Sequence, residues 1–156
     1  MIKNLFVINN IDFQNTDIPQ ELLVFINNKD IIDYLSFMGK SIAFHKSSYG
    51  TALTFLYSVK VILEEGFCEY NIPCIENGYL IIGAGSNGDL LCVNCESGSI
   101  GYAFHDDLWE KTYDSFTDIY VELPLSIERF IEMVINKKND YPFDGFEAEK
   151  YLNNNR

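Results

Sequence analysis

Three stretches in the first half of the chain carry apolar residues at helical spacing. The segment Asp17-Ile-Pro-Gln is typical of a helix start, because Asp17 can cap the helix and proline favours its first turn. A helix is therefore predicted over residues 18–28. A second predicted helix begins at Asp30 and is stopped by Gly39, and a third ends at Gly66.

Shorter apolar runs indicate strands. A first short strand is predicted at Asn4–Ile8, and the segments Ile42–His45 and Thr51–Phe55 also favour β-structure. These runs are too short to show a helical period, so β-branched and aromatic content decides the interpretation.

The middle of the chain carries the clearest pattern. Tyr79–Ile82, Asp89–Cys95 and Ile100–Phe104 are strand-like, and two turn sequences, Gly83–Gly88 and Glu96–Ser99, separate them. Connections of this length join antiparallel neighbours. The pattern predicts a three-stranded meander.

A last helix is predicted after the meander. Ser126 can cap it, and Phe130 and Val134 lie on one face. Apolar residues up to Leu152 indicate that the tail docks back on the domain, with the last few residues frayed. We therefore expect one α+β domain over residues 1–156: an antiparallel-rich mixed sheet with a central three-stranded meander, and helices packed on one face.

The net charge of the chain limits the classes of molecule that it can bind. The 156 residues include 23 Asp and Glu against 11 Lys and Arg, which gives a net charge of −12 and a pI near 4.4. Such a field repels phosphate backbones and anionic lipid surfaces. We expect no nucleic-acid partner and no membrane, and a basic protein is the better candidate. Solubility alone is the alternative explanation of the acidity.

The hydropathy of the chain and its cysteine content indicate the cellular compartment. No stretch approaches the roughly 18 apolar residues of a membrane span. The apolar segment within the first ten residues is too short for a signal peptide. We therefore expect a cytoplasmic protein whose four cysteines are reduced thiols.

The segment Gly83-Ala-Gly-Ser-Asn-Gly matches the glycine pattern of dinucleotide-binding loops. That function requires a helix to open at the third glycine, so that the helix N-terminus faces the phosphates. Here the β-patterned run from Asp89 follows instead. A hairpin loop is the better interpretation, in which Asp89 shapes the loop and the start of the next strand, and no cofactor is expected.

The cysteines are candidates for metal or redox chemistry. Cys92 and Cys95 form a C-x-x-C pair, whereas Cys68 and Cys74 have a spacing that is poor for zinc. On a strand, positions three apart point to opposite faces. We expect buried structural thiols and no metal site.

His105-Asp106-Asp107 can be imagined as a base with an orienting acid. No nucleophile elbow accompanies it, and a turn that leaves the meander explains the two acids more simply. We predict no catalytic residue and a protein that is not an enzyme. A thiol- or zinc-dependent enzyme using Cys92, Cys95 and His105 is the alternative.

Acids and aromatics are interleaved between the meander and the last helix. An acidic patch with aromatic anchors suits recognition of a basic protein. We take Asp106, Asp107, Trp109 and Glu110 as the candidate partner-binding residues. The alternative is a solvated loop whose aromatics pack inward.

Residues 78–130, about a third of the chain, carry a characteristic order of motifs. An apolar strand runs into a Gly/Ser/Asn turn and a Gly-Asp step, and a later strand ends in an aromatic followed by His-Asp. The elements are Tyr79-Leu-Ile-Ile-Gly, Ala84-Gly-Ser-Asn, Gly88-Asp89, Leu90-Leu-Cys-Val, Ser97-Gly-Ser, Ile100-Gly-Tyr-Ala-Phe-His-Asp and Leu125-Ser-Ile-Glu-Arg-Phe. This order resembles the SUKH superfamily of bacterial immunity proteins and fungal cell-wall-synthesis regulators.

The resemblance implies an α+β domain that binds another protein without catalysis. In bacteria the implied role is that of an immunity protein, which neutralises a cognate polymorphic toxin, often a nuclease. A regulatory scaffold of the fungal type is the alternative role. A nuclease carries a basic substrate groove, so the net charge of −12 agrees with the first role.

Overall fold

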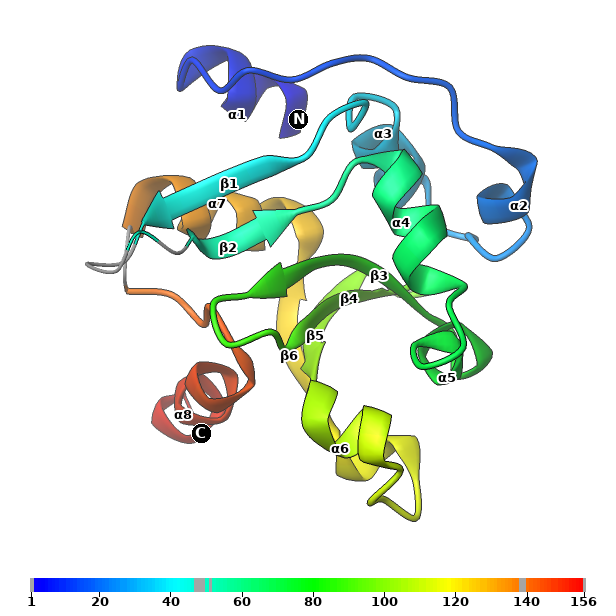
Figure 1. Cartoon of the computed structure of the whole chain (residues 1–156). Coiled ribbons are helices and arrows are strands. Elements are labelled where there is room, and N and C mark those ends of the chain that lie inside the picture. Colours follow the sequence, from blue (N-terminus) through cyan, green and yellow to red (C-terminus); the bar gives the residue numbers. More distant parts are fainter. Residues whose placement is uncertain (1, 47–49, 51, 138–139, 156) are drawn as a thin grey trace.

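The computed structural model describes residues 2–46, 50, 52–137 and 140–155. Helices surround one sheet (Figure 1). The strands are β1 (Ile42–Lys46), β2 (Ala52–Leu56), β3 (Tyr79–Gly85), β4 (Leu90–Asn94), β5 (Ser99–Ala103) and β6 (Tyr120–Ser126). The helices are α1 (Ile2–Ile8), α2 (Gln20–Leu23), α3 (Lys29–Leu35), α4 (Val59–Gly66), α5 (Ile72–Glu76), α6 (His105–Glu110), the 3₁₀ helix η1 (Phe116–Asp118), α7 (Ile127–Lys137) and α8 (Gly145–Asn154).

The sheet follows the chain from strand to strand. Its order is β1-β2-β3-β4-β5-β6, and each neighbouring pair is antiparallel. The predicted α+β fold is confirmed, and the predicted meander of β3, β4 and β5 lies at its centre. The pairings among the described strands are antiparallel throughout, so the sheet is not mixed as expected.

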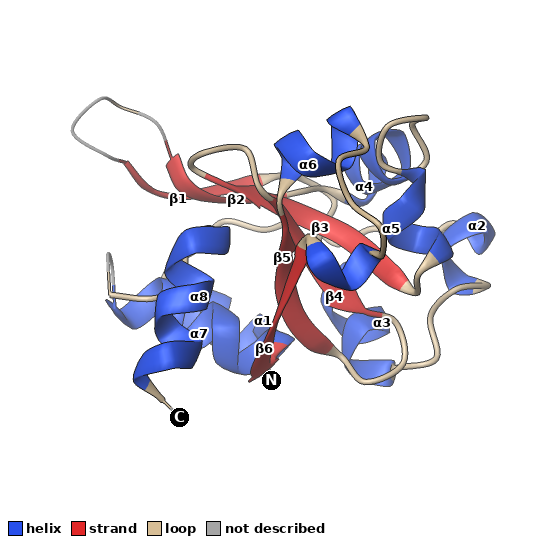
Figure 2. Cartoon of the chain, turned by 90° about the horizontal axis from the view of Figure 1, so that it is seen from below, coloured by secondary structure: helices blue, strands red, loops and turns tan. Residues whose placement is uncertain are grey.

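Both faces of the sheet are covered, as Figure 2 shows. Leu91 and Val93 of β4 belong to the larger core, which lies under α1, α3 and α7. Leu90 and Cys92, at the alternate positions, belong to a smaller cluster that includes residues of α5, α6 and η1. The prediction placed helices on one face only. The uninterrupted apolar run Leu90–Val93 explains the second layer, because a strand buried on both sides shows no alternation.

The N-terminal segment is the clearest departure from the predicted elements. Asn4–Ile8 was expected as a strand but lies within helix α1. The buried residues of α1 are Ile2 and Phe6, which are one helical turn apart and pack toward α7. A short apolar run looks the same in either structure, so its period could not be recognised.

The helices predicted next are shorter than expected. Only Gln20–Leu23 of the predicted 18–28 helix forms α2, and Asp17 does not cap it, because the N-cap position is occupied by Pro19. Helix α3 is capped by Asn28, whose side chain accepts a hydrogen bond from Asp30 N at 2.9 Å. Asp30 therefore lies in the first turn rather than at the cap.

Other predicted boundaries agree more closely. Helix α4 ends at Gly66 as expected. The segments Ile42–His45 and Thr51–Phe55, which were predicted to favour β-structure, correspond to β1 and β2. Thr51, included in the second of these segments, lies outside the described residues. Ser126 Oγ accepts a hydrogen bond from Arg129 N at 3.2 Å at the start of α7.

The C-terminal tail docks back on the sheet, as predicted. Helix α8 packs against β5 and β6, and its Ala148 is fully buried. The helix runs to Asn154, so it includes residues that were expected to be frayed. None of the described helices is long and apolar enough to cross a membrane.

Candidate functional site

The glycine-rich segment Gly83–Gly88 forms the end of β3, up to Gly85, and the hairpin loop that leads to β4. Strand β4 begins at Leu90, directly after the loop, so no helix opens at Gly88 and the predicted hairpin is confirmed. Gly88 has φ +94°, and a Cβ there would lie 3.2 Å from the His105 ring. Glycine is required at this position for its backbone conformation and for close packing under His105.

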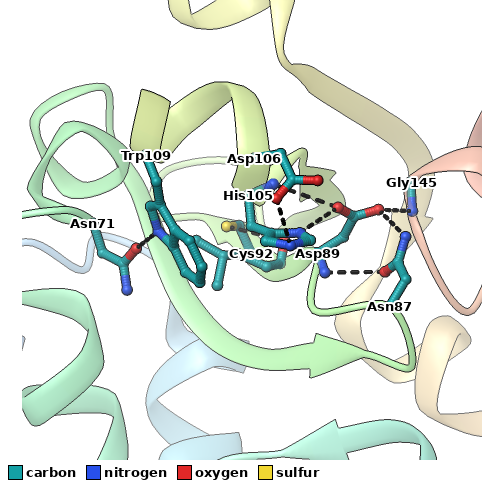
Figure 3. Close-up of polar contacts among 9 residues, drawn as sticks. Asn71, Asn87, Asp89, Cys92, His105, Asp106, Trp109 and Gly145 are labelled. Atoms are coloured by element: carbon teal, nitrogen blue, oxygen red, sulfur yellow. Dashed lines mark hydrogen bonds and ion pairs between the residues drawn. The ribbon is translucent and has the colours of Figure 1, made fainter. Parts of the chain in front are cut away.

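Asp89 follows the loop and is 2% exposed. One oxygen, Oδ2, accepts hydrogen bonds from Gly145 N at 3.0 Å and from Asn87 Nδ2 at 2.8 Å. The other, Oδ1, lies 3.0 Å from His105 Nδ1 and also accepts from His105 N at 3.4 Å (Figure 3). One carboxylate thus joins the hairpin loop, the start of α6 and the start of α8.

His105 is the first residue of α6 and lies between two carboxylates. Its Nδ1 faces Asp89, and its Nε2 lies 3.1 Å from Asp106 Oδ1. A ring nitrogen donates a hydrogen bond when it carries a proton, and carboxylate oxygens accept. The ring is therefore held in place by a carboxylate oxygen at each of its two nitrogens.

The indole of Trp109 is fixed one turn further along α6. Its Nε1 donates a hydrogen bond to Asn71 Oδ1 at 2.8 Å, and Asn71 Nδ2 donates to Glu65 O at 3.0 Å. The His105 ring meets the indole in a T-shaped contact with centroids 5.0 Å apart (Figure 3). The side chain is nevertheless 45% exposed. Trp109 therefore presents a rigid aromatic surface to solvent.

The four predicted partner-binding residues come together on one short helix. Asp106, Asp107, Trp109 and Glu110 belong to α6, and each is exposed. The segment was expected to be a turn, but it forms six helical residues in which Leu108 alone is buried. The structure thus gathers these four side chains on the surface.

The other aromatic residues between the meander and α7 pack inward, as the alternative interpretation of this segment predicted. Phe116 is buried in the smaller core, and Tyr113 packs partly against it. Asp118 is occupied as a cap, since its carboxylate accepts a hydrogen bond from Ser115 N at 2.8 Å. The described aromatics near α6 thus divide, with Trp109 facing outward and the others inward.

A pocket of about 310 Å³ lies beside Trp109. It is lined by Trp109 and by four residues from the end of α4 and the following turn: Glu65, Cys68, Tyr70 and Asn71. None of these four was predicted as part of a binding surface, and Cys68 was considered only as a metal or redox residue. The exposed Tyr70, set in the polar stretch Glu69–Asn71, is the signal that could have marked this turn as a surface.

The four cysteines are free thiols. Cys92 and Cys74 lie in the smaller core and Cys95 in the larger one, so the C-x-x-C pair points to opposite faces of the sheet as predicted. Burial raises the pKa of Cys95 to about 11 and that of Cys92 well above its usual range. Such thiols are poor nucleophiles at neutral pH.

The described histidine, cysteine and acidic side chains do not gather into a metal site. Within the described residues, no group of three or more His, Cys, Asp or Glu side chains is arranged to hold a metal ion. The side chains of Asp89 and Asp106 instead each contact a ring nitrogen of His105.

No family model, curated protein or solved structure matches this chain. The resemblance to the SUKH superfamily therefore stays a prediction from the sequence. The functional interpretation rests on the geometry and charge of the α6 surface.

Proposed function

We propose that this protein is a non-catalytic acidic module that binds a basic protein through the surface of α6. The observation that carries the proposal is the fixed, half-exposed indole of Trp109 among exposed carboxylates. Tryptophan held in one orientation loses little entropy on binding, and aromatic residues of this kind dominate the binding energy of many interfaces.

Charge around the indole favours a cationic partner. The segments Glu65–Asn71 and His105–Asp114 together contain six carboxylates and one lysine, a stronger excess than the 23 acids and 11 bases of the whole chain. A locally negative surface attracts a basic protein and speeds its association. The same field disfavours anionic ligands.

The resemblance of residues 78–130 to the SUKH superfamily supports a more specific role. An immunity protein of this kind would act in the cytoplasm and cover the basic groove of a cognate toxin. Such inhibition requires a complementary surface and no chemistry, which agrees with raised thiol pKa values and a histidine already bound by two carboxylates.

Charge reversal on α6 tests the proposal. The partner is captured from the native source at low salt and identified, and its association rate with purified protein is then measured by stopped flow. The Asp106→Lys/Asp107→Lys variant should associate about tenfold more slowly at low ionic strength, and the difference should shrink at high salt.

A matched control carries the same change in net charge elsewhere. Asp33 on α3 and Glu149 on α8 are both exposed. The Asp33→Lys/Glu149→Lys variant should retain most of the association rate. Equal rates for the two double variants would show that α6 is not the binding surface.

A further inference from the structure

We propose that the pocket between Trp109 and Tyr70 receives an arginine side chain of the partner. This inference rests on the proposed function, because it takes the partner to be a basic protein. What it adds is the chemical group that is recognised and the place where it binds.

The size of the pocket fits a side chain. Its volume of about 310 Å³ lies at the lower end of the range for small-molecule sites, roughly 300–1,000 Å³. It is open to solvent between α6 and the turn that follows α4, so an approaching surface can insert a residue without any movement of the fold.

The aromatic walls of the pocket favour a cation. The only polar atom of the Trp109 indole, Nε1, is satisfied by Asn71, so the part left for a ligand is the ring itself. Tyr70, which also lines the pocket, is 62% exposed. The face of an aromatic ring carries partial negative charge and attracts lysine, arginine and other cations.

An acidic residue in the lining of the pocket strengthens this preference. Glu65 lines the pocket, and none of the ion pairs formed by the described residues includes it. Arginine fits this combination better than lysine, because its planar guanidinium stacks on aromatic rings and binds a carboxylate with two parallel hydrogen bonds.

The pocket is organised before any ligand arrives. Asn71 is 1% exposed and holds both the indole and the carbonyl of Glu65, while His105 supports the indole from the other side. Walls that are already fixed lose little conformational entropy on binding.

Trp109 provides a direct test, because it is the only tryptophan in the chain. The probe is a short acetylated and amidated lysine peptide with one central arginine. Its controls carry citrulline, which is the uncharged analogue, or lysine at that position. At low ionic strength the arginine peptide should change Trp109 emission saturably, protect the indole from acrylamide quenching, and bind about tenfold more tightly than either control.

Variants of the walls provide the second arm, measured by calorimetry. Tyr70→Ala and Glu65→Gln should each weaken the arginine peptide by about fivefold. Phe146→Ala and Glu149→Gln are matched controls on α8, since Phe146 is 60% exposed and Glu149 is also on the surface. These controls should leave the affinity unchanged.

The two proposals fail in different ways. If arginine, citrulline and lysine peptides bind equally, or if none binds, the assignment of the pocket to arginine is wrong. If the pocket variants behave like the α8 controls, it is wrong as well. The proposed function fails separately, when reversing Asp106 and Asp107 leaves association with the captured partner unchanged.

Discussion

A single buried carboxylate, Asp89, joins three segments that are far apart in the sequence. Its oxygens meet donors from Asn87, His105 and Gly145, and the last of these lies 56 residues away. His105 in turn supports the Trp109 indole. The geometry of the candidate surface therefore depends on a residue that is itself inaccessible to a partner.

Replacing Asp89 by Asn should destabilise the protein by about 1–3 kcal/mol. The amide has one acceptor oxygen, so at least one buried N–H group now faces another donor and loses its partner. Urea unfolding followed by circular dichroism measures the loss. Trp109 emission should also shift toward longer wavelength in the folded variant, as the indole loses its support from His105.

The matched comparison is Asp33→Asn, because Asp33 is an exposed helical aspartate. It should change stability by less than about 0.5 kcal/mol. An Asp89→Asn protein as stable as the Asp33→Asn protein, with unchanged emission, would contradict the role assigned to Asp89.

Part of this arrangement could be predicted from the types of residue in the sequence. Asp89 was expected to shape the loop, and Asp106, Asp107, Trp109 and Glu110 were expected on the partner-binding surface. The direction of Trp109 could not be predicted, because it depends on the bond to Asn71, which lies 38 residues away. Contacts over such distances leave no local pattern in one sequence.

At the scale of the element, short helices were the least predictable. Helix α6 has six residues and no side-chain cap, since the N-cap position is occupied by Phe104. The acids of its first turn stabilise a helix N-terminus, but the same residues are common in turns. Tertiary packing of Leu108 fixes the helix, and that packing cannot be recognised from the sequence.

Helix α8 begins at a cap whose ionisation is unfavourable. Asp144 accepts a hydrogen bond from Glu147 N at 2.9 Å, but its side chain is buried. Burial raises the pKa of Asp144, and the charges of Asp89 and Glu147 raise it further, against the lowering effect of the cap hydrogen bonds. At pH values between the ordinary and the raised pKa, the folded state thus holds a proton that the unfolded chain has already released.

A pH-dependent stability change follows from this pKa. Because the pKa of a carboxyl is raised in the folded state, stability falls as pH rises from its ordinary value of 3.8 through the raised value. Asn caps helices as well as Asp does. Asp144→Asn should therefore be more stable than the native protein at pH 7, and this advantage should vanish below pH 3.8.

Urea unfolding at the two pH values measures this difference. Asp33→Asn again serves as the control, since it removes one negative charge from the same acidic protein at an exposed position. If both variants gain the same stability at pH 7, the gain reflects the net charge alone, and the burial of Asp144 contributes nothing.

At the scale of the whole molecule, tyrosine burial sets an alkaline limit. Burial raises the pKa of Tyr57 and of Tyr141 to about 12. It also raises the pKa of Tyr34, Tyr79, Tyr102 and Tyr120. Tyrosines of an unfolded chain ionise near pH 10, so above that pH the folded state binds more protons and stability falls.

Five of the ten tyrosines should therefore remain protonated at pH 11: Tyr34, Tyr57, Tyr102, Tyr120 and Tyr141. Their ionisation should occur together with unfolding, which ultraviolet phenolate absorbance and circular dichroism would detect as one transition. A smooth titration of all ten tyrosines near pH 10, with the circular dichroism unchanged, would contradict this burial.

The overall architecture was largely predictable because its strongest signals are local. The central meander is marked by apolar runs and turn sequences, and its connections are short enough to require antiparallel pairing. The second helical layer and strand β6 were missed. Both depend on which apolar faces meet in space, and the apolar content of Leu90–Val93 is compatible with one layer or two.

The sequential order of the strands has a consequence for how the chain reaches this structure. Three of the five strand pairings join segments separated by short connections, whereas β2 and β3 are joined through α4 and α5, and β5 and β6 through α6 and η1. The entropic cost of loop closure rises with the length of the loop, so the pairings across short connections can form by local steps. The contacts that hold α6 close longer loops, since His105 lies 16 residues from Asp89 and Trp109 lies 38 residues from Asn71. The surface proposed for binding thus depends on contacts whose formation costs more chain entropy than the short hairpins of the sheet.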